Sequence, residues 1–386
     1  MDSAPSGSWI WEQPQWPRFR WEHQQLHPGL TAANQARQHL LAKLEALDPS
    51  LQQEAAASLL SREGLNTTAI EGETLDPAMV RSSLARRLQL PLQSGQPQPS
   101  AQVEGLVDLL MAATTQLSAP LTVERLNGWH RQLFQGGASS LRSVPVGVLR
   151  SGSVPMQVVS GAIGRERVHF EAPPSCGLPG MLAVFLHWFN TPPQDLHPLL
   201  RSGVTHLWFV TLHPYEDGNG RLGRALTERV LAQASLAEVN TSPLVIHALG
   251  LSSQLLRQRQ AYYQMLEAAQ RGNLDITPWL GWFLEQVRAA AVANVAVVEA
   301  VKAKALFWWI HRTNDFNPRQ RKLLNRLWDA EPEGFQGDLT IRKAVGLTRV
   351  SRATAYRDLS DLVKKGALVP CGRGRSGAYR LVLRQG

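Results

Sequence analysis

The sequence predicts a mainly α-helical fold, in which a helical core is interrupted by one β-hairpin and flanked by a helical N-terminal domain and a small C-terminal domain. Apolar residues recur with helical spacing over most of residues 101–300. A polar, proline-rich stretch at 89–100 separates this region from the helical patterns that precede it. Beyond residue 300 the chain becomes strongly basic. These observations predict domains over residues 1–100, 101–300 and 301–386.

Individual helices are expected wherever apolar spacing follows the helical period between turn signals. In the N-terminal region such patterns run from about 31 to 86. In the central region we expect helices over residues 101–117, 122–134, 177–190, 197–212, 219–234, 247–271 and 277–300. The segments Arg150–Gly161 and Arg167–Pro174 interrupt this pattern and read as a β-hairpin that ends at two prolines.

Composition argues against several classes of protein. The two cysteines, Cys176 and Cys371, lie far apart, and no Cys/His cluster has the spacing of a metal site, which fits a reducing cytosol. No run of about 18 apolar residues occurs, so we expect no membrane helix. The first residues lack the basic segment and apolar core of a signal peptide. We therefore expect a cytoplasmic protein that does not act at a membrane.

The densest chemistry in the chain lies in His213–Arg224, with the sequence HPYEDGNGRLGR. It combines one titratable base, two carboxylates, a Gly-Asn-Gly turn and two arginines. Because the turn opens a helical pattern, unpaired backbone N–H groups and the helix dipole favour an anion there. Arg221 and Arg224 lie three residues apart on that helix, and guanidinium groups suit phosphate. The stretch therefore predicts a polyphosphate site.

Single residues of this stretch have separate expected roles. Gly218, Asn219 and Gly220 would form the anion-binding turn, with the Asn219 side chain as an additional donor. The carboxylate of Asp217 is placed to hold Mg²⁺ between two phosphates. An imidazole with a pKa near neutrality, as expected for His213, can take a proton from a hydroxyl at pH 7. Each feature alone is more often a turn, a solvated helix face or a structural hydrogen bond, but their order and spacing favour function.

This stretch resembles the active-site motif of the Fic family, H-[PF]-F-x-[DE]-G-N-[GK]-R-x-x-R, and departs from it only at Tyr215, where phenylalanine is usual. Most members of that family transfer AMP from ATP to a Ser, Thr or Tyr hydroxyl on a protein. The resemblance implies that His213 is the general base, that Asp217 is the Mg²⁺ ligand and that Arg221 and Arg224 hold the outer phosphates. The added hydroxyl of Tyr215 must find water or a partner, with little expected effect on function.

A second motif of the family lies upstream, in Thr67–Gly72, with the sequence TTAIEG. It fits the inhibitory pattern [ST]-x-x-x-E-[GN], and the resemblance implies an inhibitory helix over about residues 60–72. Glu71 would occupy Arg224, so that ATP binds with its α-phosphate out of line for attack. The pattern by itself is also common at helix ends.

The predicted hairpin resembles the flap of the family, to which a target segment adds as a further strand. Its expected docking residues are Met156, Gln157, Val158 and Val159. A plain structural hairpin fits the same sequence.

Several other positions have open or structural assignments. Gln258, Tyr262 and Tyr263 either line the nucleotide pocket, as similar residues do in the family, or belong to the core. His206 lies two helical turns before the motif histidine, and we expect it to be structural because both cannot touch one ligand. Four tryptophans within residues 8–21 could stack bases, but we expect them to pack on helices.

The C-terminal segment resembles a winged helix-turn-helix domain. Helices are expected over residues 318–329, 339–345 and 350–365, the last capped by Ser351, with a basic wing after them. Residues 301–386 hold 18 Lys/Arg against 7 Asp/Glu, whereas the other 300 residues hold 22 against 24. This asymmetry favours DNA as a partner over the alternative use of the fold in protein docking.

The residues expected to contact DNA come from the recognition helix and the wing. They are Arg352, Thr354, Tyr356, Arg357, Arg373 and Arg375.

Three functions stay open at this point. The first is a Mg²⁺-dependent protein adenylyltransferase that uses ATP, modifies a target protein or itself, and is held low by Glu71. The second is a DNA-binding regulator whose Fic core senses nucleotide. The third is removal of AMP from proteins, with Glu71 orienting the attacking water. Related proteins often dimerise, so a homodimer is among the expected assemblies.

Overall fold

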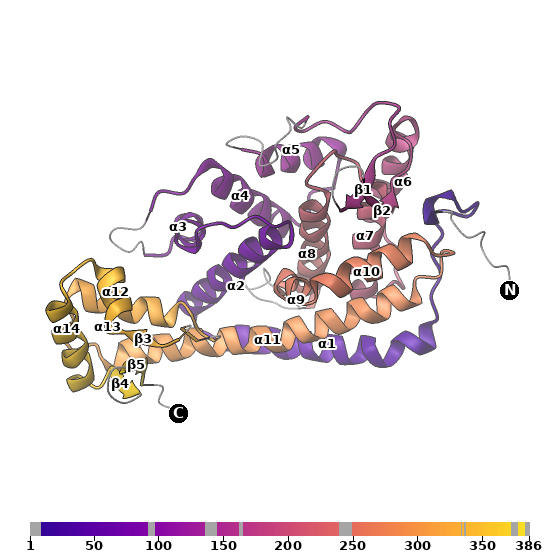
Figure 1. Cartoon of the computed structure of the whole chain (residues 1–386). Helices are drawn as coiled ribbons and strands as arrows, with labels where there is room; N and C mark the ends of the chain where they lie inside the picture. Colours follow the sequence, from indigo (N-terminus) through magenta and orange to yellow (C-terminus); the bar gives the residue numbers. More distant parts are fainter. Residues whose placement is uncertain are drawn as a thin grey trace. The chain divides into compact units, whose positions relative to one another are not determined.

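The computed structural model describes residues 9–91, 97–135, 145–161, 165–238, 249–332, 334–335, 337–371 and 377–382. The chain forms two compact units, Met1–Asn294 and Val295–Gly386, and the division falls within the long helix α11 (Thr277–Ile310). Helices dominate the described residues, and the strands form small antiparallel sheets (Figure 1). The predicted mainly α-helical class with a β-hairpin is confirmed. The predicted domain boundaries at residues 100 and 300 stay predictions.

The first unit opens with η1 (Ile10–Glu12), α1 (His23–Glu45), α2 (Pro49–Ile70) and α3 (Pro77–Arg87). The α2 and α3 helices are capped by Asp48 and Asp76, whose side chains accept backbone N–H groups of the first turn. A proline follows each cap, where its missing N–H costs nothing. Gly72 then takes a φ of +85°, which ends α2 at the Thr67–Gly72 motif.

The centre of this unit is the pair α7 (Pro198–Leu212) and α8 (Asn219–Glu238), which pack along one another. Every residue from 202 to 212 is buried, because α7 is apolar on nearly all sides. The His213–Arg224 stretch thus begins at the end of the most buried helix. Around this pair lie α4 (Ala101–Thr115), α5 (Val123–Leu133), η2 (Ser175–Gly177), α6 (Leu178–Asn190), α9 (Leu251–Arg257) and α10 (Arg259–Gln270).

The single helix predicted over 247–271 is wrong. In the described part, α9 and α10 are separated at Gln258, which has φ −106° and ψ 27°. Apolar residues keep the helical period across this break, so periodicity alone does not reveal it. The helix predicted to end at 300 also continues, as α11, to Ile310.

The predicted hairpin consists of β1 (Gln157–Ser160) and β2 (Arg167–Glu171), which pair antiparallel. Gln157 lies opposite Glu171, and the register shifts between Val158 and Val159. Every β1 residue is exposed, whereas Phe170 of β2 is buried against Trp9. Trp9 therefore packs on the hairpin and not on a helix as expected, whereas Trp16 lies against Trp208 of α7 as expected.

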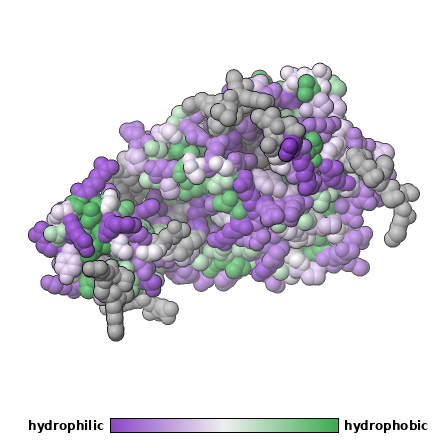
Figure 2. All heavy atoms as spheres, viewed as in Figure 1, coloured by the Kyte–Doolittle hydropathy of each residue, from purple (hydrophilic) through white to green (hydrophobic). Residues whose placement is uncertain are grey.

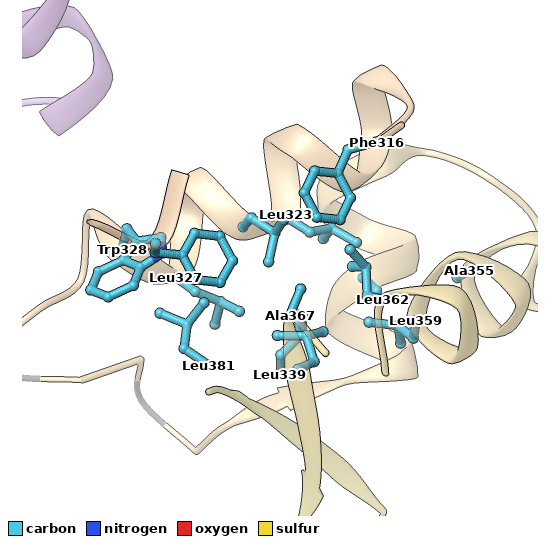
Figure 3. Close-up of a cluster of buried hydrophobic side chains, with 14 residues drawn as sticks. Phe316, Leu323, Leu327, Trp328, Leu339, Ala355, Leu359, Leu362, Ala367 and Leu381 are labelled. Carbon is cyan, nitrogen blue, oxygen red and sulfur yellow. The ribbon is translucent and has the colours of Figure 1, made fainter. Parts of the chain in front are cut away.

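The second unit contains α12 (Pro318–Trp328), β3 (Leu339–Thr340), α13 (Ile341–Thr348), α14 (Arg352–Lys364), β4 (Leu368–Cys371) and β5 (Ala378–Leu381). The sheet order is β3-β5-β4, with antiparallel pairs. Its core joins apolar side chains of α12 and α14 to those of the sheet, as Leu323, Leu359 and Leu381 illustrate in Figure 3.

Two predicted boundaries in this unit are wrong. Residues 339–340 are a strand rather than the start of a helix, because the Thr340 side chain caps α13 by accepting the Lys343 N–H. The helix predicted to end at 345 continues, as α13, to Thr348, and Arg349 after it has a left-handed backbone. Ser351 caps α14 as predicted, by accepting the Thr354 N–H.

Hydrophilic side chains are interspersed with hydrophobic ones on the visible face of the first unit (Figure 2). Among the described residues, no helix has both the length and the apolar character needed to cross a membrane.

Candidate active site

His213 follows α7 in a left-handed backbone conformation, with φ 47° and ψ 58°. Few non-glycine residues adopt it, so surrounding contacts must hold it. The half-buried imidazole donates from Nδ1 to Val210 O at 3.4 Å, which leaves Nε2 as the acceptor. Burial, aided by the charge of Arg150, lowers the pKa of His213 to about 4, below the near-neutral value expected from the sequence. The ring is therefore neutral at pH 7.

Asn219 closes the loop between α7 and α8. Its Oδ1 accepts the Tyr215 N–H at 3.0 Å, and its Nδ2 donates to Tyr215 O at 2.7 Å. This side chain is 3% exposed, so the structure gives it a loop-holding role where the sequence predicts a phosphate donor. Gly218 next to it has a φ of +79°, a conformation that favours glycine.

The first turn of α8 presents backbone N–H groups that have no acceptor within the helix. The first intrahelical bond runs from Leu222 N to Gly218 O at 3.0 Å, so the N–H groups of Asn219, Gly220 and Arg221 precede it. The positive end of the helix dipole lies at the same place. This is the geometry of an anion site, at the position where the sequence predicts one.

Arg224 lies close to this turn and bonds to the end of α2. Its Nε donates to Thr67 Oγ1 at 2.7 Å, and its Nη2 donates to Thr67 O at 2.9 Å and to Glu71 Oε1 at 2.6 Å. Thr67 and Glu71 are four residues apart, so both face Arg224 from the last turn of α2. The structure thus brings the Thr67–Gly72 motif against the His213–Arg224 stretch.

The charge of Glu71 is stabilised by this contact. Burial alone would raise the pKa of the Glu71 carboxyl, but the charge and hydrogen bond of Arg224 lower it below its ordinary value. Conversely, Glu71 raises the pKa of Arg224 despite its burial. A Cβ on Gly220 would overlap Glu71 Oε1, so the glycine makes room for the carboxylate.

Arg221 also lies at the site and keeps an unused donor. It is 4% exposed, with Nη1 at 3.6 Å from Glu73 Oε1 and Nη2 at 3.8 Å from Asp217 Oδ1. Its Nε is buried and has no hydrogen-bond partner among the described residues. Gln102 holds Glu73 in place through a bond of 2.9 Å to Oε2. The sequence analysis missed Glu73, although its acidic character so close to Glu71 was a usable signal.

A second group that the sequence analysis missed supports the loop from α5. His130 Nδ1 accepts the Gly147 N–H at 2.8 Å, so Nε2 carries the proton and donates to Asp217 O at 3.1 Å. Burial lowers the pKa of His130, which keeps this neutral form. Its ring stacks on Tyr215, whose hydroxyl donates to Asn127 Oδ1 at 2.8 Å. The partner expected for the Tyr215 hydroxyl is therefore present.

The remaining candidate residues divide between core and site. His206 is fully buried between Thr227 Oγ1 at 2.9 Å and Tyr262 OH at 2.8 Å, which confirms its structural role. Tyr262 is 1% exposed and belongs to the core. Tyr263 lies nearer the surface, with its hydroxyl at 3.4 Å from Ile70 O at the end of α2.

Two family models match parts of the chain. Residues 120–231 match the Fic/DOC family model, and residues 9–90 match a domain of unknown function, DUF4172. The chain carries a Fic/DOC domain. This domain includes the motif at 213–224 and the hairpin, whereas Glu71 lies in the DUF4172 match.

Relatives of the Fic/DOC domain are named protein adenylyltransferase Fic. The one from Drosophila virilis is 32% identical over 130 residues, 32% of this chain and 23% of the relative. The one from Nematostella vectensis is 27% identical over 220 residues, 56% of this chain and 44% of the relative. The chain thus matches less than half the length of either relative.

The fold is shared with a solved structure of a Fic family protein from Desulfovibrio desulfuricans. The TM-score is 0.51 at 20% identity, and the match covers 93% of this chain and 97% of the other. At this identity the likeness shows the fold alone.

Proposed function

We propose that the protein is an adenylyltransferase that transfers AMP from ATP to a hydroxyl of a protein. The observation that carries this proposal is a neutral imidazole at one end of a short loop with an anion site at the other. His213 follows α7, and the open N–H groups of α8 begin six residues later. The names of the relatives support the same reaction class.

In the proposed reaction, Nε2 of His213 takes the proton of the target hydroxyl. The hydroxyl oxygen then attacks the α-phosphorus of ATP, the bond to the β-phosphate oxygen breaks, and pyrophosphate leaves. Arg221 and Arg224 hold the outer phosphates, and the first turn of α8 receives phosphate oxygens. The buried, unpartnered Nε of Arg221 fits this role, because a phosphate oxygen would satisfy it.

The residues present also fit Mg²⁺. Asp217 offers a carboxylate whose side chain is 40% exposed beside the anion site, and Mg²⁺ is commonly held by one or two carboxylates together with substrate phosphates. No cluster of three His, Cys, Asp or Glu side chains with metal-site geometry is found in the described part of the chain. Asp217 would hold the ion, which neutralises phosphate charge when bound.

We also propose that the conformation described here is inhibited. Glu71 occupies Arg224 at 2.6 Å and Glu73 lies at 3.6 Å from Arg221, so both arginines that would hold the outer phosphates face carboxylates. A triphosphate can reach its productive position only if these contacts loosen, because like charges repel at short range. The DUF4172 segment would therefore act as the brake on the Fic/DOC domain.

The hairpin supports a role in target docking. All four β1 residues are exposed and β1 has an open edge among the described strands, so a target segment can pair with its backbone. Gln157, Val158 and Val159 lie on this strand. Met156 instead packs on the cluster around Trp9 and Phe170, so it would shape the base of the strand.

A second candidate function concerns the C-terminal unit, which we propose to be a DNA-binding winged helix. On α14, Ala355 and Leu359 are buried while Arg352, Tyr356 and Arg357 are exposed, so the predicted contact residues share the outer face. Thr354 is half-buried at the start of the same helix. The predicted wing residues Arg373 and Arg375 lie outside the described residues.

Labelling with ATP that carries the label on the α-phosphate tests the transferase. We expect Glu71→Gly to label itself or a lysate protein strongly, wild type weakly, and Glu71→Gly with His213→Ala not at all. Omission of Mg²⁺ should abolish the label. Loss of label from pre-modified protein only in the presence of Glu71 would favour AMP removal, and no labelling by any variant would contradict the transferase.

A further inference from the structure

Arg150 is a buried arginine that forms no ion pair with any described residue. It is 7% exposed, and its guanidinium donates only to backbone carbonyls. Nε donates to His213 O at 2.7 Å, while Nη2 donates to Leu212 O at 3.3 Å and to Pro173 O. Burial lowers the pKa of Arg150, because the charged form loses contact with water. Because a buried charge without a counter-ion is unfavourable, Arg150 is expected to have a role that a neutral side chain does not fill.

The contacts of Arg150 join three segments that the proposed reaction must align. Arg150 precedes the hairpin in the chain, and Pro173 follows it. The backbone N–H of Arg150 also donates to Pro214 O at 2.9 Å. At the hairpin base, Ala172 N donates to Met156 O at 2.9 Å, which closes the hairpin. One residue therefore ties both roots of the hairpin to the loop that carries His213.

The same contacts set the backbone on both sides of His213. The guanidinium bonds to the carbonyls of Leu212 and His213, and the Arg150 N–H bonds to that of Pro214. Because peptide groups are planar, three fixed carbonyls leave little freedom to the dihedral angles between them. This accounts for the left-handed conformation of His213, which is otherwise unfavourable for a residue with a side chain.

We propose that Arg150 is a positioning residue that holds His213 and the target-docking hairpin in a fixed position relative to each other. The proposal rests on the proposed transferase function. In that reaction the hairpin places the target hydroxyl and His213 removes its proton. The hydroxyl and the imidazole must therefore lie within hydrogen-bond distance of each other. A shift of about 1 Å between them is enough to cost about 100-fold in rate.

Arg150→Gln and Arg150→Lys in the Glu71→Gly background test this proposal, with Arg288→Gln as a control that removes a partly exposed arginine of α11. We expect Arg150→Gln to lower kcat for self-labelling by about 100-fold without changing KM for ATP, because the phosphate site is untouched. Arg150→Lys keeps the charge but lacks the planar fork, so it should recover only part of the rate. A parallel loss of ATP affinity, or full activity in Arg150→Gln, would overturn the proposal.

Hydrogen exchange tests the positioning role without any turnover. We expect Arg150→Gln to accelerate exchange in peptides from the hairpin and from residues 209–215. Exchange in α8 and the melting temperature of the second unit should stay unchanged. If no variant transfers AMP but this pattern appears, the transferase proposal fails and the link through Arg150 stands. Unchanged exchange in both Arg150→Gln and Arg150→Lys would overturn the link itself. If Arg150→Gln does not fold, Arg150→Lys carries both measurements.

Discussion

The arginines of α8 and those of α14 are the same residue type in opposite surroundings. Arg221 and Arg224 are 4% and 2% exposed, and each faces a carboxylate of the DUF4172 segment. Arg352 and Arg357 are exposed on the outer face of α14. Burial restricts Arg221 and Arg224 to ligands that fit the site and accept their hydrogen bonds. Arg352 and Arg357 are exposed, so their positive charge is the main indication of what they bind. The surroundings of an arginine therefore limit its possible ligands more than the residue type alone does.

Removing a buried support of the α8 site should have the largest effect. We expect Asn219→Ala to lower AMP transfer by about 100-fold or more, because both bonds that close the 213–218 loop are lost and its groups move apart. Initial rates of α-phosphate labelling in the Glu71→Gly background measure this. Retained activity would show that the loop keeps its shape without Asn219.

The exposed arginines of the second unit should each contribute a similar, smaller amount to DNA affinity. We expect Arg352→Ala and Arg357→Ala in the full chain each to weaken binding to a short DNA duplex by about 1–3 kcal/mol and to reduce its salt dependence. Fluorescence anisotropy at several salt concentrations measures this, with Arg288→Ala as the matched control. No salt-dependent binding by wild type would contradict DNA recognition and favour protein docking.

The two carboxylates that face the α8 arginines should differ in strength. Glu71 bonds to Arg224 at 2.6 Å, whereas Glu73 lies at 3.6 Å from Arg221 and is partly exposed. A charge-assisted bond is worth about 1.5–3 kcal/mol, and an exposed pair about 1 kcal/mol or less. We therefore expect Glu73→Gln to raise labelling by only about fivefold, well below Glu71→Gly. Equal activation by Glu73→Gln and Glu71→Gly would show that the proposed inhibition does not depend on the contact with Arg224 alone.

The smallest effect is expected from pH on the transfer rate. Because the pKa of His213 is lowered to about 4, the imidazole stays neutral from pH 8 to pH 5 and its rate contribution should stay level. The same shift predicts a loss of stability on acidification, since the unfolded histidine gains its proton near 6.5 and the folded one only near 4. Labelling rates and urea unfolding across this range measure both. A rate that falls with a midpoint near 6.5 would contradict the buried base.

Much of the site could be read from the sequence because its residues are neighbours in the chain. Residues 213–224 form one loop and one helical turn, so spacing alone predicts which groups meet there. The cap at Ser351 and the hairpin are local in the same sense. The break at Gln258 and the Thr340 cap of α13 are also local, but the apolar periodicity on which the helix predictions rest does not report them.

The amino-acid sequence by itself determined where the predicted anion-binding turn, the predicted base and the acidic motif lie, since short-range geometry follows from residue type and spacing. Only the tertiary structure decided how these are held. It placed Thr67 and Glu71 on Arg224 across more than 150 residues and turned Asn219 toward Tyr215. It also lowered the pKa of His213 and set Arg150 against its carbonyl. Burial and contacts between distant segments produce these effects, and neither is a property of a residue's neighbours in the chain.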